Sequence, residues 1–303
     1  MTVRDAISLA GGILGGVDGW RLDAEVLLGH VLGWRRIEIF SRPEQALSPD
    51  EENRYRVLLE RRSRHEPVAY ITGQREFYGR QFEVGPGVLV PRPESEMLVD
   101  IVLAHCREQK HDLRMIDIGT GSGALAVTLA LEIPSAHVWA SDCSVQALGW
   151  AWRNARRLLP VPQGARPAAS AEPADDTRGW TGECANLHLA HGDCFAQVAG
   201  RFDIVVSNPP YLTRDELAGA MPDVRDWEPA LALVAEDNGM AVYRDIIGQL
   251  PARLAPHGLA VFEISDTVAR DMHNEARSAG FGCTILPDLA GHQRVAVLKT
   301  LSE

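Results

Sequence analysis

The sequence predicts an α/β protein in which a small all-helical unit precedes a doubly wound, mostly parallel β-sheet. Three observations support this prediction. Apolar residues at helical spacing dominate the first 75 residues. From Glu94 onward, short apolar segments typical of strands alternate with helical segments. The last two of these strands follow each other without a helix between them, which indicates a closing hairpin and an antiparallel edge strand.

Residues 1–75 are expected to form the helical domain. Ser48 is a cap signal and Pro49 occupies the first helical position of one helix. The helical spacing of an earlier segment is carried by Leu22, Val26, Leu27, Val31 and Leu32. The following segment, 76–92, mixes aromatic residues, alternation and Gly/Pro turns, so it is predicted to be a β-hairpin linking two domains.

Residues 93–303 are expected to form the sheet domain. Its seven strands are predicted at "RMIDIG", "HVWAS", "LHLAH", "FDIVVS", "LAVFEI", "GCTIL" and "RVAVLK". One segment near 160–185 interrupts the alternation. Because it is rich in Pro, Ala, Gly and acidic residues and lacks apolar periodicity, we interpret it as a flexible surface insertion.

Composition excludes several classes of function. The net charge of -11 argues against a broad surface for nucleic-acid phosphates. The five cysteines form no Cys-x-x-Cys pair, so neither a zinc ribbon nor a disulfide framework is indicated. Since no leader pattern and no apolar run of membrane-spanning length is present, we expect a cytoplasmic protein without a membrane partner.

A glycine-rich loop follows the first strand of the sheet domain. It reads Gly119, Thr120, Gly121, Ser122, Gly123 and leads into the helical segment "ALAVTLALE". Glycines allow a tight turn and close approach of a ligand, and the helix N-terminus offers free N–H groups. The loop also satisfies the permissive dinucleotide pattern, so by itself it does not distinguish NAD from another nucleoside cofactor.

Acidic residues follow the next two strands. Asp142 can accept hydrogen bonds from both hydroxyls of a ribose, in NAD or in S-adenosylmethionine, and its alternative role is to cap the next helix. Asp193 can accept from an adenine amino group, and its alternative role is that of a turn residue.

The fourth strand ends in an unusual corner, Asn208-Pro209-Pro210-Tyr211. The two prolines fix the backbone and leave carbonyls free, at the sheet edge where ligands bind in doubly wound folds. An amide oxygen and a carbonyl together can hold both hydrogens of a planar NH2 group and stabilise charge developing on its nitrogen. The Tyr211 ring is expected to lie against the substrate or a cationic sulfonium.

These residues support a family resemblance. Asn-Pro-Pro-Tyr after a glycine-loop core resembles the motif of enzymes that methylate planar amino or amide nitrogens, including DNA methyltransferases and protein-glutamine methyltransferases. Segments such as "RLDAEVLLGHVLG", "DIGTGSGALAVTLA" and "FDIVVSNPPY" resemble the release factor glutamine methyltransferase family almost from end to end. The resemblance implies a class I S-adenosylmethionine-dependent methyltransferase with a Rossmann-like seven-stranded sheet, joined by the hairpin to the helical domain.

The resemblance also implies chemistry and partners. The activity would be N5-methylation of the glutamine in the Gly-Gly-Gln loop of class I peptide release factors, with S-adenosylmethionine as donor and S-adenosylhomocysteine as product. By position, Gly119 to Gly123, Asp142, Asp193 and Cys194 should surround the cofactor, and the helical domain should dock the release factor. Asn208, Pro209, Pro210 and Tyr211 should hold the glutamine, with Asn208, Pro209 and Tyr211 taking part in catalysis. Asn208 should also border the cofactor.

Three details modify the resemblance. Pro91 to Glu96 favour the release-factor branch over a sister family that methylates a ribosomal-protein glutamine. The family often has Glu-Ile-Gly-x-x-Gln at the fifth strand, whereas this chain has Ser265 to Val268 after Glu263-Ile264. Cys194 stands where an aromatic or aliphatic residue often packs near adenine.

Other interpretations remain open at this point. A DNA adenine methyltransferase would share the corner, although the chain lacks a separate basic target-recognition region. A cofactor-binding adaptor without catalysis would not need Asn208. His188 and His191 suggest a metal, but their spacing on a strand favours a structural role. An arginine run could form a docking face or a solvated helix: Arg54, Arg56, Arg61, Arg62 and Arg64.

Overall fold

The computed structural model describes residues 1–107, 112–160 and 179–301. These residues fall into two compact units, each with its own core. The first unit consists of Met1–Gln74 together with Met221–Trp227, and the second of Arg75–Ala220 together with Glu228–Glu303. Most of the insertion predicted near 160–185 lies outside the described residues.

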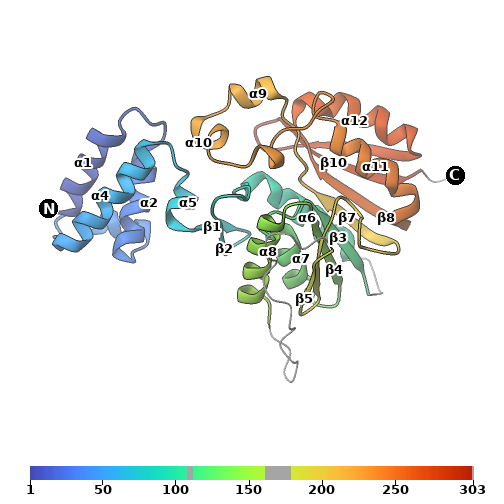
Figure 1. Cartoon of the computed structure of the whole chain (residues 1–303), viewed down its shortest axis with the longest axis horizontal. Coiled ribbons are helices and arrows are strands. Elements are labelled where there is room, and N and C mark those ends of the chain that lie inside the picture. Colours follow the sequence, from blue (N-terminus) through green and yellow to red (C-terminus); the bar gives the residue numbers. More distant parts are fainter. Residues whose placement is uncertain (108–111, 161–178, 302–303) are drawn as a thin grey trace. The chain divides into compact units, whose positions relative to one another are not determined.

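The regular structure of the first unit is helical, as the sequence predicts, apart from Gln74 at the start of β1 (Gln74–Phe77) and an isolated β-bridge between Thr2 and Ala46 (Figure 1). Its helices are α1 (Val3–Leu14), α2 (Trp20–Leu32), α3 (Arg36–Ser41), α4 (Pro49–Ser63), α5 (Val68–Thr72) and the short α10 (Pro222–Arg225). Ser48 caps α4 by accepting a hydrogen bond from the Glu51 N–H, and the Glu51 carboxylate accepts from the Ser48 N–H in return. Leu27, Tyr55 and Leu59 are fully buried in the core of this unit.

Arg62 connects the two sequence segments of the helical unit. Its side chain is only 4% exposed. Nε donates to Asp23 Oδ2 at 2.7 Å, and Nη2 lies 3.4 Å from Asp223 Oδ2 in the returning segment. Arg62 therefore takes part in a buried ion-pair network, unlike the solvated or docking arginine that the sequence suggests. Position in the arginine run could not reveal this, because Asp223 is distant in sequence.

The second unit is built on an eight-stranded sheet with the order β5-β6-β4-β3-β7-β8-β10-β9. Five neighbouring strands are parallel: β6 (Leu187–His191), β4 (His137–Asp142), β3 (Arg114–Ile118), β7 (Phe202–Ser207) and β8 (Leu254–Glu263). The antiparallel strands are β5 (Thr181–Cys184), β9 (Phe281–Pro287) and β10 (Gln293–Thr300). The closing hairpin of β9 and β10 confirms part of the prediction for the end of the chain. The strand that runs against β8 is β10, which lies between β8 and β9 rather than at the edge.

The eighth strand, β5, was not predicted. It is short, its sequence Thr-Gly-Glu-Cys has no apolar alternation, and it lies in the segment interpreted as an insertion. It forms because the edge of β6 offers unpaired backbone groups, and β5 pairs with them from Thr181 to Cys184. A strand that depends on a tertiary partner rather than on its own pattern leaves little trace in sequence.

Helices cover both faces of the sheet (Figure 1). They are α6 (Glu96–Cys106), α7 (Ala124–Glu132), α8 (Val145–Leu158), α11 (Ala241–Arg253) and α12 (Asp266–Ser278). Residues of α6, α7 and α8 share one core cluster with one set of strand side chains, and residues of α11 and α12 share the other. Shorter helical turns are η1 (Pro93–Ser95), α9 (Arg214–Ala218) and η2 (Ala230–Ala232). No helix in the described ranges has the length and apolar content needed to cross a bilayer.

The predicted hairpin is present as β1 (Gln74–Phe77) and β2 (Arg80–Glu83). Phe77 and Phe82 are buried in the same cluster as α6, α7 and α8. Except for Gln74, the hairpin is therefore part of the second unit, where the sequence suggested a linker. The difference arises because the two aromatic side chains pack into the sheet domain's core.

Candidate active site

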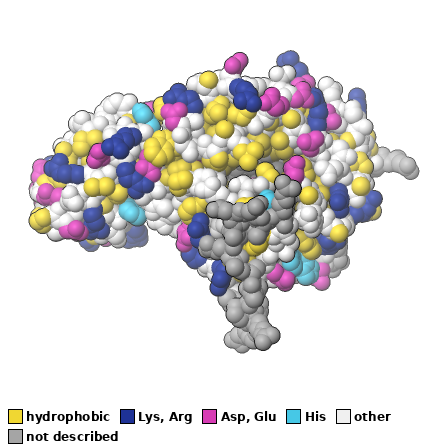
Figure 2. All heavy atoms as spheres, in the orientation of Figure 1, with side chains coloured by type: hydrophobic (Ala, Val, Ile, Leu, Met, Phe, Trp, Pro, Cys, Tyr) yellow, Lys and Arg dark blue, Asp and Glu magenta, His cyan; other side chains and the backbone are white. Residues whose placement is uncertain are grey.

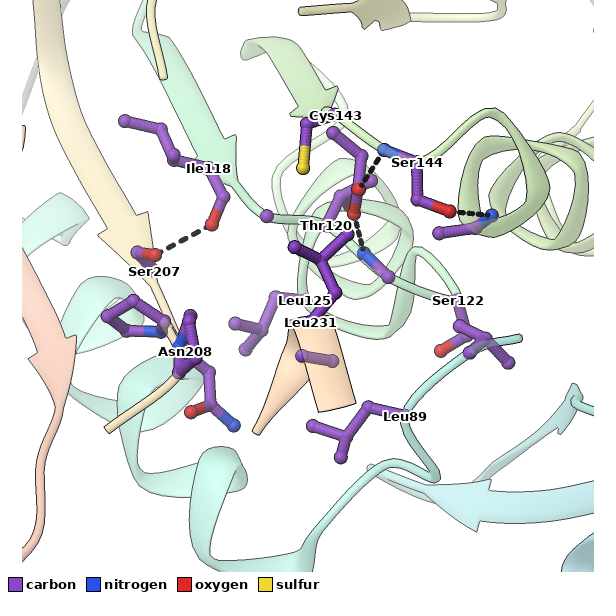
Figure 3. A pocket seen from close by; sticks show the side chains of 18 of the residues that line it. Leu89, Ile118, Thr120, Ser122, Leu125, Cys143, Ser144, Ser207, Asn208 and Leu231 are labelled. Atoms are coloured by element: carbon purple, nitrogen blue, oxygen red, sulfur yellow. Dashed lines mark hydrogen bonds between the residues drawn. The ribbon is translucent and has the colours of Figure 1, made fainter. Parts of the chain in front are cut away.

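A cavity of about 380 Å³ lies at the carboxyl ends of the parallel strands of the second unit. Ligands bind at this edge in doubly wound sheets, and the volume is within the range of small-molecule sites. The lining comes from segments that are far apart in sequence: 87–92, 118–125, 142–147, 192–194, 207–210 and 229–232, together with Phe77, Ser95, Val242 and Asp245. The cavity thus contains the glycine loop and the proline corner together (Figure 3).

The buried carboxylate of Asp117 accepts hydrogen bonds from the glycine loop and from the first turn of α7. Asp117 Oδ2 accepts hydrogen bonds from Thr120 Oγ1 at 2.7 Å and from the Ala126 N–H at 3.2 Å. Burial raises the pKa of Asp117 to about 7. The loop needs glycine, because φ is +71° at Gly119 and +58° at Gly121.

The loop also leaves room for a ligand. A Cβ added at Gly119 would meet no atom of the described residues within 4 Å, and one at Gly121 would meet only Val88 Cγ2, at 3.7 Å. Both glycines line the cavity. Such a cradle, which a side chain would fill, fits the close approach of a nucleoside cofactor to the backbone.

Asp142 binds the loop rather than capping the next helix through its side chain. Its Oδ2 accepts from the Gly121 N–H at 2.9 Å, and its Oδ1 accepts from the Ser144 N–H at 2.8 Å. Ser144 is the residue whose side chain caps α8, by accepting from the Ala147 N–H. Burial raises the pKa of Asp142. Each carboxylate oxygen keeps a lone pair for a ligand hydroxyl at the cavity wall.

Asp193 and Cys194 both border the cavity, with different environments. The Asp193 residue is exposed, whereas Cys194 is buried. Cys194 has a left-handed backbone with φ of +46°, and its carbonyl accepts from Ser141 Oγ at 2.7 Å. Burial, followed by the neighbouring Asp193 charge, raises the pKa of Cys194 to about 12, so the sulfur at the cavity wall remains a neutral thiol.

The corner after β7 brings the polar side chain of Asn208 to the cavity wall. Ser207 Oγ donates to the Ile118 carbonyl at 2.6 Å and ties the end of β7 to β3 (Figure 3). Asn208 Nδ2 donates to Ser95 Oγ at 3.2 Å. Within the described chain, Asn208 Oδ1 has no hydrogen-bond partner, and Asn208, Pro209 and Pro210 line the cavity. An open carbonyl oxygen at a cavity wall can accept a hydrogen bond from a substrate NH2.

Tyr211 is not among the residues that line the cavity. Its side chain packs against the core cluster of α11 and α12. Burial, followed by the charge of Glu263, raises the pKa of Tyr211 to about 12. The structure therefore brings Asn208, Pro209 and Pro210 to the glycine loop and leaves the Tyr211 ring beside them.

Sequence reasoning missed two parts of the cavity wall, 87–92 and 229–232. They are joined by Glu228, whose carboxylate accepts from the Val90 N–H at 3.0 Å and from Arg92 Nη2 at 2.6 Å. A possible signal was Glu228-Pro229, an acidic residue fixed by a following proline. Nothing in the sequence indicates that these residues meet Val90 across 138 positions.

The environment of His188 gives no support to the metal site that His188 and His191 suggest in the sequence. His188 stacks on Trp139 with ring centroids 4.9 Å apart, and its pKa is lowered by burial. Within the described ranges, no group of His, Cys, Asp and Glu is arranged to hold a metal ion.

Comparisons with known proteins agree with this geometry. The PrmC N-terminal domain family matches residues 11–73, and the methyltransferase small domain family matches residues 95–161. The release factor glutamine methyltransferase of Burkholderia pseudomallei is 39% identical over 262 residues, covering 86% of this chain and 85% of that protein. The protein of the same name from Neisseria gonorrhoeae is 38% identical over 283 residues, covering 92% of this chain and 93% of that protein.

The chain belongs to the release factor glutamine methyltransferase family.

The fold of this family member also occurs among distant solved structures. The hMettl16 catalytic domain, crystallised in complex with the MAT2A 3'UTR hairpin 1, has a TM-score of 0.53 and 14% identity, with 86% of this chain and 84% of that chain covered. At this identity the likeness shows the fold alone. It confirms the predicted class I methyltransferase architecture.

The departure at Ser265 to Val268 has a structural explanation in this family member. Asp266 accepts from the Gln293 N–H at 2.8 Å and pairs with His292, which attaches the start of α12 to β10. Val268 is fully buried in the core. Asp266 and Val268 thus have local partners, and none of these four residues lines the cavity.

Proposed function

We propose that this enzyme methylates the side-chain amide nitrogen, N5, of the glutamine in the Gly-Gly-Gln loop of class I peptide release factors. The observation that carries the proposal is the open Oδ1 of Asn208 at the same cavity wall as the glycine loop. A planar amide NH2 needs acceptors there, and the relatives named above act on a release factor glutamine.

The cofactor of the proposed reaction is S-adenosylmethionine, which supplies an electrophilic methyl group and leaves as S-adenosylhomocysteine. Gly119 to Gly123 would hold it through backbone N–H groups, and Asp142 would accept from the ribose hydroxyls. Asp193 and Cys194 would border the adenine. The room above Gly119 and Gly121 supports this assignment.

The chain's own contribution to the chemistry is orientation and charge stabilisation. An amide nitrogen is a poor nucleophile because its lone pair is delocalised. Asn208 Oδ1 and the Pro209 carbonyl would hold the two N–H groups, which orients the nitrogen and stabilises the positive charge that develops on it. Pro210 would form the wall beside the amide, and Tyr211 would support this corner. The amide loses its proton to water after methylation, so no strong base is required.

We also propose that the helical unit docks the release factor, in the cytoplasm where translation takes place. On α4, Val57 is 49% exposed and lies next to the exposed Arg56. Within the described chain Arg56 has no ion-pair partner, whereas Arg54 pairs with Asp50 and Arg64 pairs with Glu60. An exposed apolar side chain beside an unpaired cation is a suitable contact for a protein partner.

Substitution of Arg56 and Val57 on α4 tests this docking. The double variant Arg56→Glu, Val57→Asp is expected to raise KM for the release factor and to leave the Kd for S-adenosylmethionine unchanged. Arg270→Glu, an exposed charge reversal on α12, is the matched control. An unchanged KM in the double variant would place the docking surface elsewhere.

The proposed activity itself is tested by incubating the enzyme with labelled S-adenosylmethionine and purified release factors, then mapping the methylated residue by mass spectrometry. We expect a single methyl group on the Gly-Gly-Gln glutamine. Duplex DNA forms the second arm of the test. We expect no label there, since the net charge is -11 and cationic and anionic side chains are mixed on the face shown in Figure 2. Methylation of DNA alone, or of another residue, would overturn the proposal.

A further inference from the structure

A buried chain of hydrogen bonds leads from the end of β8 to the open amide of Asn208. Ser95, the last residue of η1, is 4% exposed, and Glu263, the last residue of β8, is 1% exposed. Ser95 Oγ donates to Glu263 Oε2, although the two residues are 168 positions apart. The same Ser95 Oγ accepts from Asn208 Nδ2 at 3.2 Å.

The direction of these bonds follows from the number of protons. An ionised carboxylate only accepts, and a serine hydroxyl carries a single proton. When the Ser95 hydroxyl donates its proton in a hydrogen bond to the Glu263 carboxylate, the Ser95 oxygen can only accept a further hydrogen bond. It must therefore face the NH2 of Asn208. The Asn208 carbonyl oxygen is then directed to the other side, where no described residue meets it.

This direction decides whether Asn208 can serve the reaction. The two orientations of an asparagine side chain differ only by the exchange of its oxygen and nitrogen. In one orientation a carbonyl oxygen meets the substrate NH2, and in the other an NH2 meets an NH2, which leaves both without an acceptor. We propose that Ser95 and Glu263 are positioning residues that fix the amide orientation of Asn208; this inference rests on the glutamine methylation proposed above.

The network also gives the enzyme a pH dependence. Burial raises the pKa of Glu263 to about 7, and the other charged groups that act on the carboxyl are Arg294 on β10, Arg92, and Glu94 on η1. The hydroxyl of Tyr243 on α11 donates to the Glu263 carbonyl at 2.6 Å, and the Tyr211 phenol lies near enough for the Glu263 charge to raise its pKa.

Protonation would reverse the order of donors. A protonated Glu263 can donate to Ser95, which can then donate to Asn208 Oδ1 and turn its NH2 toward the substrate. Turnover is therefore expected to fall as the pH drops below about 7, where Glu263 takes up a proton.

The kinetic test compares Ser95→Ala, Ser95→Thr and Glu263→Gln with the unmodified enzyme. The measured quantities are kcat and KM for the release factor, the Kd for S-adenosylmethionine, and the pH profile of kcat. Ser95→Ala is expected to lower kcat by about 10²-fold with little change in Kd, because orientation is lost. Ser95→Thr keeps the hydroxyl and should recover most of the turnover. Glu263→Gln should lower kcat and remove the decline below about pH 7. Thr128→Val, which removes a buried hydroxyl of α7 outside the cavity, is the control.

A second measurement needs no substrate and so separates this inference from the proposed function. Selective ¹⁵N labelling of asparagine reports the side-chain NH2 of Asn208, whose signal is assigned by its loss in Asn208→Asp. We expect the chemical shift of this signal to change with pH, with a midpoint near pH 7. This pH-dependent change should be absent in both Ser95→Ala and Glu263→Gln. If the signal is unmoved by Ser95→Ala and shows no such step, the inference is overturned. If the step is present but no release factor is methylated, only the proposed function fails.

Discussion

Two asparagine side chains of the second unit use the same amide group in opposite ways. Asn154 is fully buried, and its Oδ1 accepts from the Glu83 N–H while its Nδ2 donates to the carbonyls of Glu83 and Ser122. Asn208 is partly exposed and leaves Oδ1 open at the cavity. A saturated amide stabilises structure, whereas one with a free acceptor at a cavity wall is available to a ligand.

Removal of the open amide tests its part in turnover. Asn208→Ala is expected to lower kcat by about 10²- to 10³-fold, as does loss of one preorganised group that stabilises developing charge. The Kd for S-adenosylmethionine should change little, because the glycine loop and Asp142 are untouched. Steady-state kinetics and calorimetric titration measure the two quantities. Asn274→Ala, on the exposed side of α12, should leave both unchanged; equal turnover in Asn208→Ala would remove Asn208 from the mechanism.

A second prediction at this scale concerns the Asp142 carboxylate, which accepts one backbone N–H on each oxygen. In Asp142→Asn, one of these N–H groups must face an NH2 instead. Hydrogen bonds to a charged group contribute about 1.5–3 kcal/mol, so S-adenosylmethionine should bind about tenfold weaker or worse. Calorimetric titration gives the Kd. Asp193→Asn is the comparison, and it should have a smaller effect because Asp193 is exposed. The reverse order would show that Asp142 only supports the loop.

At the scale of elements, the hairpin and α8 are joined by Asn154, which gives β2 a hydrogen-bond partner on its open edge. Asn154→Ala would leave the Glu83 backbone groups and the Ser122 carbonyl without this partner. We expect the free energy of unfolding to fall by about 2–4 kcal/mol. Urea denaturation, monitored by circular dichroism, measures the change, with Asn274→Ala again as the control. A loss no greater than that of the control would mean that water replaces the amide.

The elements also show how far the sequence could predict the structure. The sequence could place Asp142 and Asn208 at the cavity because each comes at the end of an apolar strand, and the ends of parallel strands meet at one edge of the sheet. Ser95, Glu228 and Glu263 were not found, because their roles depend on segments that meet only in the folded chain. The same reason explains why β5 and the buried ion pairs of Arg62 were missed. Local patterns predict elements and strand ends, whereas contacts between distant segments need the tertiary structure.

At the scale of the whole molecule, the dependence of stability on pH is set by two groups of carboxyls in an acidic chain. The net charge is -11, and burial raises the pKa of Asp117, Asp142 and Glu263 in the second unit. By contrast, hydrogen bonds lower the pKa of the surface carboxyls of Asp5 and Asp226 and of the partly exposed Glu51. The two groups act in different pH windows, so stability is expected to be highest in mildly acidic solution.

The sign of the alkaline limb can be worked out from Glu263. Its pKa is raised from 4.5 to about 7, so between these values the folded chain binds a proton that the unfolded chain does not. The free energy of unfolding therefore falls as the pH rises through this window, by about 3 kcal/mol for a shift of this size. Glu263→Gln has no charge to bury, so its gain in stability over the unmodified protein should be larger at pH 8 than at pH 5. Urea denaturation at the two pH values measures the difference, and an equal effect at both would show that Glu263 titrates near its ordinary pKa. Because the same substitution is expected to lower kcat, stability gained at pH 8 together with lost turnover would indicate that the buried charge is maintained for its effect on Asn208.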